Sequence, residues 1–202
     1  MIAKDLACRR GDRVLFHGLS LSLNAGDALH VTGANGIGKS SLLRIMAGLL
    51  HPYAGSIESH GAIGLLDERP ALDLHRPLGQ VLSFWARIDD APRNERETMA
   101  DLLGLGPLQD VPVRYLSTGQ RKRAALVRLI DQNAPVWLLD EPLNGLDSEA
   151  TGIVERIVAD HCSAGGIAVI ASHQPFTTPA IAQFDLTQCV PPPQADLVDE
   201  LP

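Results

Sequence analysis

Aromatic residues are scarce in this chain: phenylalanine, tryptophan and tyrosine together make up 4% of its 202 residues. Proteins that bind single-stranded nucleic acid stack bases on aromatic side chains, and nucleic-acid-binding domains usually carry a basic surface. This chain has a formal net charge of -7. The composition therefore argues against nucleic acid as the main partner.

Cysteine and long apolar runs are scarce as well. Cys8, Cys162 and Cys189 are far apart and form no C-x-x-C pair, which argues against a disulfide framework or a structural zinc site. No stretch approaches the roughly 18 consecutive apolar residues of a membrane-spanning helix. The N-terminal residues carry charges where a signal peptide has an apolar segment. We therefore expect neither a secretory signal nor a membrane span in this sequence.

Hydrophobic residues make up 45% of the chain, and their spacing alternates between strand and helix patterns. This alternation predicts an α/β fold with a mainly parallel sheet, flanking helices and a small antiparallel β part near the N-terminus. The expected strands cover residues 13–23, 28–33, 56–59, 62–66, 135–142 and 166–173. The expected helices cover residues 39–50, 76–90, 94–106 and 148–162, with a further helix that opens near residue 117.

One domain is predicted over residues 1–187, and its helices from about residue 74 to 130 form an α-helical insert. Apolar residues from Leu78 to Ile88 recur at helical spacing, so one face of that helix should be buried. Residues 188–202 are rich in proline and acidic side chains, and we expect a weakly ordered tail there.

The stretch GANGIGKS (33–40) fits the pattern G-x-x-x-x-G-K-[ST] of a phosphate-binding loop. Its glycines let backbone N–H groups converge on a phosphate, and the helix that follows adds the positive end of its dipole. Lys39 can reach the β- and γ-phosphates, and Ser40 can give its hydroxyl to Mg²⁺. The apolar strand before the loop and the helix after it favour a nucleotide site over a simple glycine turn.

The stretch VWLLDEP (136–142) places two carboxylates at the end of an apolar strand. In a parallel sheet this edge is where ligands bind. Asp140 can hold Mg²⁺, and Glu141 can orient or deprotonate an attacking water.

The stretch LSTGQ (116–120) opens a helix with small, hydrogen-bonding residues. Arg121, Lys122 and Arg123 follow, although cations at a helix N-terminus cost about 0.3–1 kcal/mol each. A helix start with free N–H groups and positive charge favours an anion.

Along the chain, the phosphate loop comes first, LSTGQ second and the apolar strand with its two carboxylates third. This order is the pattern of ATP-binding-cassette ATPases, which the chain resembles over about residues 2–187. The run LNGLD is similar to the family's D-loop and contains Asp147, and ASHQ carries His173 where the family has its switch histidine. A strand-end histidine alone would carry no such meaning. The resemblance implies a P-loop NTPase-type fold.

The resemblance implies ATP and Mg²⁺ as cofactors and a homodimer, with each ATP between one copy's phosphate loop and the other's LSTGQ helix. It places the cations at 121–123 beside the partner's ATP, while the alternative stays open that each is simply a good helix former on a solvated face. It assigns catalysis to Glu141, His173 and Lys39, and Mg²⁺ to Ser40, Asp140 and Glu68. The nucleotide-binding residues it implies are Arg10, Gly33, Ala34, Asn35, Gly36, Ile37, Gly38, Lys39, Ser40, Ser41, Ser117, Gly119, Gln120 and Asp147.

Two positions depart from the family pattern. Many cassettes stack adenine on an aromatic residue where this chain has Arg10, which can either stack on the base or simply lie at the surface. The family's switch-loop glutamine is replaced by Glu68, which can meet a metal but adds negative charge beside the triphosphate. Fast, well-coupled hydrolysis is therefore in question.

Among cassettes, the chain looks most like the ATP-binding subunits of haem exporters of cytochrome c maturation. That resemblance implies an integral-membrane permease as partner, no nucleic acid, and a peripheral location at the cytoplasmic face of the bacterial inner membrane. Three alternatives stay open: an exporter with another cargo, a cassette that acts on DNA or ribosomes, and a weakly hydrolysing ATP switch subunit.

Overall fold

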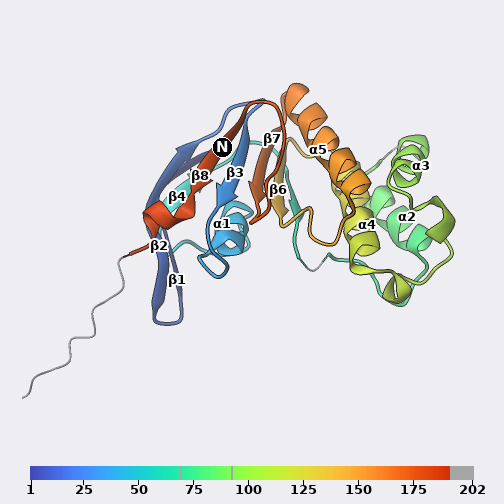
Figure 1. Ribbon diagram of the computed structural model, residues 1–202, viewed down its shortest axis with the longest axis horizontal. Helices are drawn as coiled ribbons and strands as arrows, with labels where there is room; N and C mark the ends of the chain where they lie inside the picture. Colours follow the sequence, from blue (N-terminus) through green and yellow to red (C-terminus); the bar gives the residue numbers. More distant parts are fainter. Residues whose placement is uncertain (69, 92, 192–202) are drawn as a thin grey trace, which may run out of the picture.

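Figure 1 shows the computed structural model, which describes residues 1–68, 70–91 and 93–191. Of the tail expected over residues 188–202, only the part up to residue 191 is among them. The short 3-10 helix η3 (Leu186–Cys189) includes its first two residues.

Five parallel strands form the main sheet, in the order β5-β6-β7-β3-β8. A second, antiparallel sheet has the order β2-β1-β4. The main-sheet strands are β3 (Ala28–Thr32), β5 (Ile63–Leu66), β6 (Val136–Asp140), β7 (Ile167–Ala171) and β8 (Ile181–Asp185). The second sheet contains β1 (Ile2–Arg10), β2 (Arg13–Ser22) and β4 (Ala54–Glu58).

Side chains on successive residues of the central strands point into two different cores, as the period-two geometry of a strand requires. Val136 and Leu138 of β6 join a cluster with α1 (Lys39–Met46) and the second sheet. Trp137 and Leu139 join a cluster with α4 (Thr118–Asp131) and α5 (Ser148–Ser163). Burial on both faces explains why β6 is apolar up to Asp140 and why β7 is apolar throughout.

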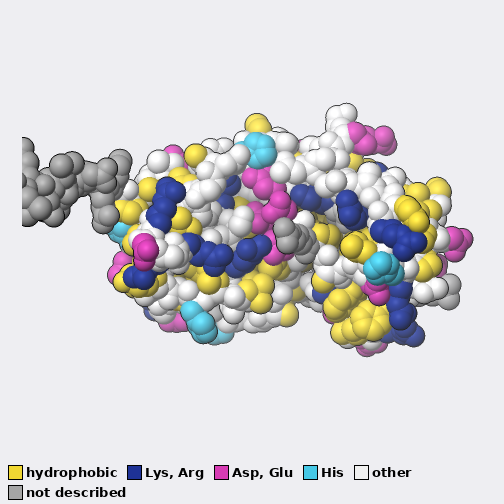
Figure 2. Space-filling view, turned by 90° about the horizontal axis from the view of Figure 1, so that it is seen from below, with side chains coloured by type: hydrophobic (Ala, Val, Ile, Leu, Met, Phe, Trp, Pro, Cys, Tyr) yellow, Lys and Arg dark blue, Asp and Glu magenta, His cyan; other side chains and the backbone are white. Residues whose placement is uncertain are grey.

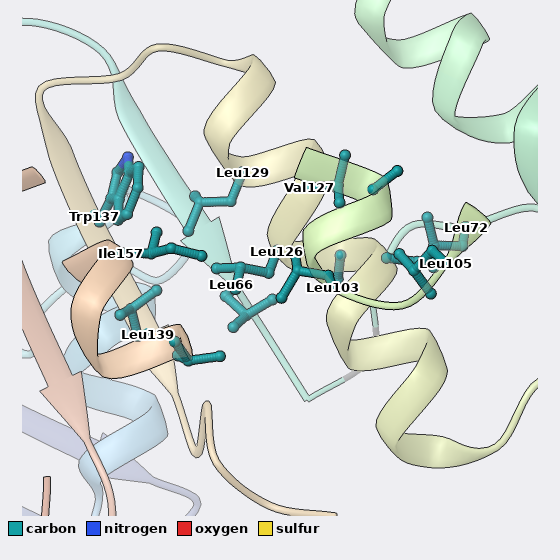
Figure 3. Packing of buried hydrophobic residues seen from close by; sticks show 14 of the residues in the cluster. Leu66, Leu72, Leu103, Leu105, Leu126, Val127, Leu129, Trp137, Leu139 and Ile157 are labelled. Atoms are coloured by element: carbon teal, nitrogen blue, oxygen red, sulfur yellow. The ribbon is translucent and has the colours of Figure 1, made fainter. Parts of the chain in front are cut away.

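The second core extends without interruption into the helical insert, which forms the right-hand part of Figure 1. Figure 3 shows Trp137 and Leu139 at one end of this packing, Leu126 of α4 and Leu103 in the middle, and Leu72 and Leu105 at the other end. The helix α4 is therefore the element that joins the insert to the sheet. The other insert helices are α2 (Leu78–Ile88), α3 (Arg93–Leu102) and the 3-10 helices η1 (Gly106–Leu108) and η2 (Val113–Tyr115).

The fold class is confirmed, and each expected helix and strand is present, several of them shorter than expected. One part of the α2 prediction is wrong. Leu78, Val81 and Leu82 are buried, but Ile88 is 58% exposed because the helix ends there and no further turn packs beside it. Among the described residues, no helix has the length and apolar character needed to cross a membrane.

Candidate functional site

The carboxyl ends of β3, β6 and β7 meet at one edge of the main sheet. Val31 pairs with Ala171, which in turn pairs with Asp140. Figure 2 shows a face on which acidic side chains gather near the middle, with lysine and arginine on both sides. A cavity of about 590 Å³ lies at the sheet edge, a size that suits a small-molecule ligand. Predicted site residues that line it are Arg10, Asn35, Gly36, Gly38, Lys39, Ser40, Ser41, Glu68, Asp140, Glu141 and His173.

The phosphate loop adopts a conformation that only glycine takes up easily. Gly33 and Gly38 have φ values of 134° and 119°. Lys39 is 6% exposed, and its Nζ donates to the carbonyls of Gly33 (2.8 Å) and Ala34 (3.3 Å). The helix α1 begins at Lys39 without a side-chain cap, so its first backbone N–H groups are available to an anion.

Asp140 is 4% exposed, and its Oδ1 has no hydrogen-bond partner among the described residues. Burial raises the pKa of this carboxyl, and a hydrogen bond from the Ser40 side chain opposes the shift. An orphaned buried carboxylate oxygen beside a serine hydroxyl fits Mg²⁺, which prefers oxygen ligands and takes few of them from protein. Within the described part of the chain, no group of three His, Cys, Asp or Glu side chains could hold a metal unaided.

Glu141 follows Asp140 in a left-handed conformation, with φ of 47°. Its backbone N–H donates to the Ala171 carbonyl at 2.8 Å. Its Oε2 lies 2.9 Å from Nδ1 of His173 and accepts a hydrogen bond from Oγ of Ser172 at 3.3 Å. The structure thus brings together the predicted base and the predicted switch histidine.

Lys122 also belongs to this site, although its sequence position does not predict that it lines the cavity of its own chain. It is 8% exposed, lines the same cavity, and its Nζ donates to the backbone carbonyl of Glu141. Arg123 also has a partner within the chain, because its Nη1 donates to the Leu103 carbonyl at 3.0 Å. Both cations therefore have partners within the chain, and the expectation that the cations at 121–123 lie beside a partner's ATP stays a prediction.

The LSTGQ stretch does not line the cavity apart from Thr118. Ser117 caps α4: its Oγ accepts from the Gln120 N–H at 3.1 Å, and the Gln120 Oε1 accepts from the Ser117 N–H at 2.8 Å. Gly119 packs against the backbone of Gly145 so closely that a Cβ there would collide with its carbonyl. Asp147 caps α5 through the Ala150 N–H at 2.8 Å.

Glu68 is exposed, whereas the side chain of its neighbour Asp67 is held by hydrogen bonds. Asp67 is held by Nη2 of Arg44, which lies 3.1 Å from both of its carboxylate oxygens, and the Glu68 N–H donates to Asp67 Oδ1 at 2.7 Å. The loop that carries Glu68 is thereby tied to α1. Arg10 enters the cavity wall from β1.

A family model described as "ABC transporter" matches residues 16–144, more than half of the chain. The chain belongs to the ABC transporter family. Membership confirms the predicted class, an ATP-binding and ATP-hydrolysing transporter subunit, and nucleotide binding follows from it. The individual roles of the site residues stay predictions.

Two relatives from this family carry the name "Cytochrome c biogenesis ATP-binding export protein CcmA". The protein from Novosphingobium aromaticivorans is 60% identical, and the match covers 87% of this chain and 90% of the relative. The protein from Sphingopyxis alaskensis is 51% identical over 91% of this chain and 95% of the relative.

Solved structures of ABC proteins share the fold. CbiO1 from Clostridium perfringens, part of the ABC transporter complex cbiONQ, has a TM-score of 0.68 at 25% identity, covering 86% of this chain and 78% of that one. An ATP-binding subunit of an ABC transporter has a TM-score of 0.76 at 20% identity, and the match covers 85% of this chain and 78% of that one.

Proposed function

We propose that this chain is the ATP-hydrolysing subunit of the haem exporter of cytochrome c biogenesis, in which hydrolysis drives haem delivery or the release of a haem-loaded chaperone. The observation that carries the proposal is the 60% identity to a relative bearing that name, over nearly the full length of both chains. The site geometry supports the ATPase half of the proposal independently.

In the proposed mechanism, the loop of residues 33–40 binds the phosphates of ATP. The glycine backbone and the start of α1 supply N–H donors, and Lys39 exchanges its two carbonyl partners for phosphate oxygens. Ser40 and Asp140 would hold Mg²⁺, with Glu68 beside them. When bound, that ion neutralises charge on the phosphate oxygens.

Glu141 acts as the base that orients and deprotonates the attacking water, and His173 steadies the γ-phosphate. Glu141 and His173 follow the adjacent strands β6 and β7, and their side chains lie 2.9 Å apart. Catalysis of phosphoryl transfer depends mainly on positioning and charge neutralisation, which a rigid sheet edge provides.

Two copies of the chain would form the active unit. Each ATP would lie between one copy's phosphate loop and Ser117, Gly119 and Gln120 of the other, with Asp147 close to the same interface. A permease in the membrane would convert closing and opening of this dimer into transport. The chain would sit peripherally at the cytoplasmic face of the bacterial inner membrane, with no role for nucleic acid.

A second candidate, a weakly hydrolysing ATP switch subunit, is favoured by Glu68. This carboxylate lines the cavity together with Asp140 and Glu141 and raises its negative charge. An exporter with a different cargo would share the same chemistry.

The first experiment is a pull-down from membranes of the native host with tagged Glu141→Gln protein and Mg-ATP, analysed by mass spectrometry. We expect the pull-down to recover the permease and the haem-handling proteins of cytochrome c maturation. Recovery of an unrelated permease would overturn the cargo and leave the ATPase chemistry standing. A phosphate-release assay on the wild-type complex separates a transport ATPase from a switch subunit, which would hydrolyse ATP only slowly.

A further inference from the structure

Lys122 of α4 has a charged group that reaches the turn of Glu141 in the same chain. It lies in the second turn of the helix, its side chain is 8% exposed, and its Nζ donates to the Glu141 carbonyl. This hydrogen bond crosses from the insert side of the molecule to the end of β6. It is thus a direct link between α4 and the residue proposed as the base.

A buried lysine is costly unless other groups compensate for the lost hydration. Burial lowers the pKa of Lys122, and the charges of Glu141, Asp140 and Glu68 act in the opposite direction. The same three carboxylates line the cavity with Lys122. The ammonium group therefore lies among three carboxylates, in a cavity that Arg10 and Lys39 also line.

The backbone of Glu141 needs such support. Its φ of 47° is unfavourable for a residue with a Cβ, and such a conformation persists only where the surroundings hold it. The turn is held on one side by the bond from the Glu141 N–H to the Ala171 carbonyl, and on the other by Lys122. The side chain is aimed from this turn toward His173.

We propose that Lys122 is a positioning residue for ATP hydrolysis: it fixes the turn that presents Glu141 and supplies the positive charge that lets Glu68 share the cavity. The inference rests on the proposed role of Glu141 as the base. It gives a physical reason why a carboxylate is compatible with hydrolysis at position 68.

The test compares Lys122→Met, which removes the charge and the donor, with Lys122→Arg, which keeps both. Each variant is measured as the full chain assembled with its permease, by phosphate release at varied ATP and by calorimetric ATP binding. We expect Lys122→Met to lower kcat at least tenfold with less than a threefold change in the Kd for ATP. Lys122→Arg should retain a third or more of the wild-type kcat.

The matched control is Arg128→Met. It too removes a cation of α4, but the Arg128 guanidinium lies 3.6 Å from the centre of the Trp85 ring in the insert, and Arg128 does not line the cavity. We expect it to lower the melting temperature while leaving kcat within twofold. Equal losses of kcat in Arg128→Met and Lys122→Met would overturn the inference, because the effect would then be general loss of stability.

The charge relation is tested in the Glu68→Gln background. In this background, the fold-loss of kcat caused by Lys122→Met should be less than half of the fold-loss measured with Glu68 present. One of the three carboxylates whose negative charge Lys122 offsets is then gone. Identical losses of kcat in both backgrounds would overturn the claim that Lys122 compensates for the charge of Glu68.

A Lys122→Met variant with wild-type kcat would overturn the positioning role and leave the ATPase intact. A wild-type complex without hydrolysis would overturn both the inference and the proposed function. If Lys122→Met fails to fold, Lys122→Gln serves in the same comparison.

Discussion

Nδ1 of His173 and Oε2 of Glu141 lie 2.9 Å apart, and this contact joins the loops that follow β7 and β6. The Glu141 side chain is 19% exposed and that of His173 is 47% exposed, so both can still reach a ligand in the cavity. A base that is already oriented by its neighbour needs little reorganisation when substrate binds.

Glu141→Gln removes the proton acceptor and keeps the shape of the side chain. We expect phosphate release to fall by about 10²–10⁴-fold, the usual contribution of a general base. ATP binding should persist, and an ATP-bound dimer should accumulate. Gel filtration with Mg-ATP reports the dimer, and a monomer at high protein and ATP concentration would contradict this prediction.

His173→Ala removes the ring that contacts Glu141. Because a hydrogen bond to a charged group contributes about 1.5–3 kcal/mol, we expect kcat to fall about tenfold to a hundredfold. The Kd for ATP should change little. His17→Ala, at an exposed position of β2, is the control for replacing a surface histidine and should hydrolyse ATP like the wild type.

Lys39→Ala removes the cation of the phosphate loop. The charge-assisted bonds that Lys39 would make to phosphate oxygens are worth about 1.5–3 kcal/mol, so ATP affinity should fall about tenfold or more. Calorimetric titration measures it, with Lys4→Ala, a lysine on β1 that pairs with Glu58, as the control. Unchanged affinity would reject the phosphate-loop interpretation.

Ser117 allows its two roles to be separated, because it caps α4 and is also predicted to contact a partner's ATP. Ser117→Ala should cost about 1 kcal/mol of stability through the lost cap. Ser117→Asp keeps a capping oxygen and should restore the stability, measured by urea unfolding. It should not restore hydrolysis, because its charge repels a triphosphate; full activity in Ser117→Asp would exclude a phosphate contact at this position.

The sequence was informative wherever one short motif determines local backbone and chemistry together. The glycines and Lys39 of the phosphate loop, and the carboxylates after β6, could be placed in advance because a strand, a turn and a helix start fix them locally. The pairing of Glu141 with His173 could be anticipated only through a family resemblance, since it joins residues 32 positions apart.

The missed features are those that depend on distant partners or on irregular strands. The strand β1 escapes a period-two pattern because register shifts interrupt its pairing with β2. The Ser117–Gln120 capping box was visible as S-x-x-Q and could have been found from that spacing alone. Lys122 could not, because only the folded chain brings its Nζ to the Glu141 carbonyl, 19 positions away in sequence.

We expect Asp131, near the end of α4, to make the stability of the protein depend on pH. It is 9% exposed, its Oδ2 has no hydrogen-bond partner among the described residues, and burial raises its pKa from 3.8 to about 6. The charge of Asp89 acts in the same direction and that of Arg96 opposes it. Because the folded chain holds this proton more tightly than the unfolded chain, the free energy of unfolding should fall as the pH rises from about 4 to 6.

Asp131→Asn removes the titration, so it should stabilise the protein by about 1–3 kcal/mol at pH 8 and by less than half as much at about pH 4.5. Urea unfolding at both pH values measures the difference, and Asp160→Asn, an exposed position on α5, is the control that should show neither effect. Equal stabilisation by Asp131→Asn at both pH values would mean that the gain does not come from relief of a buried charge.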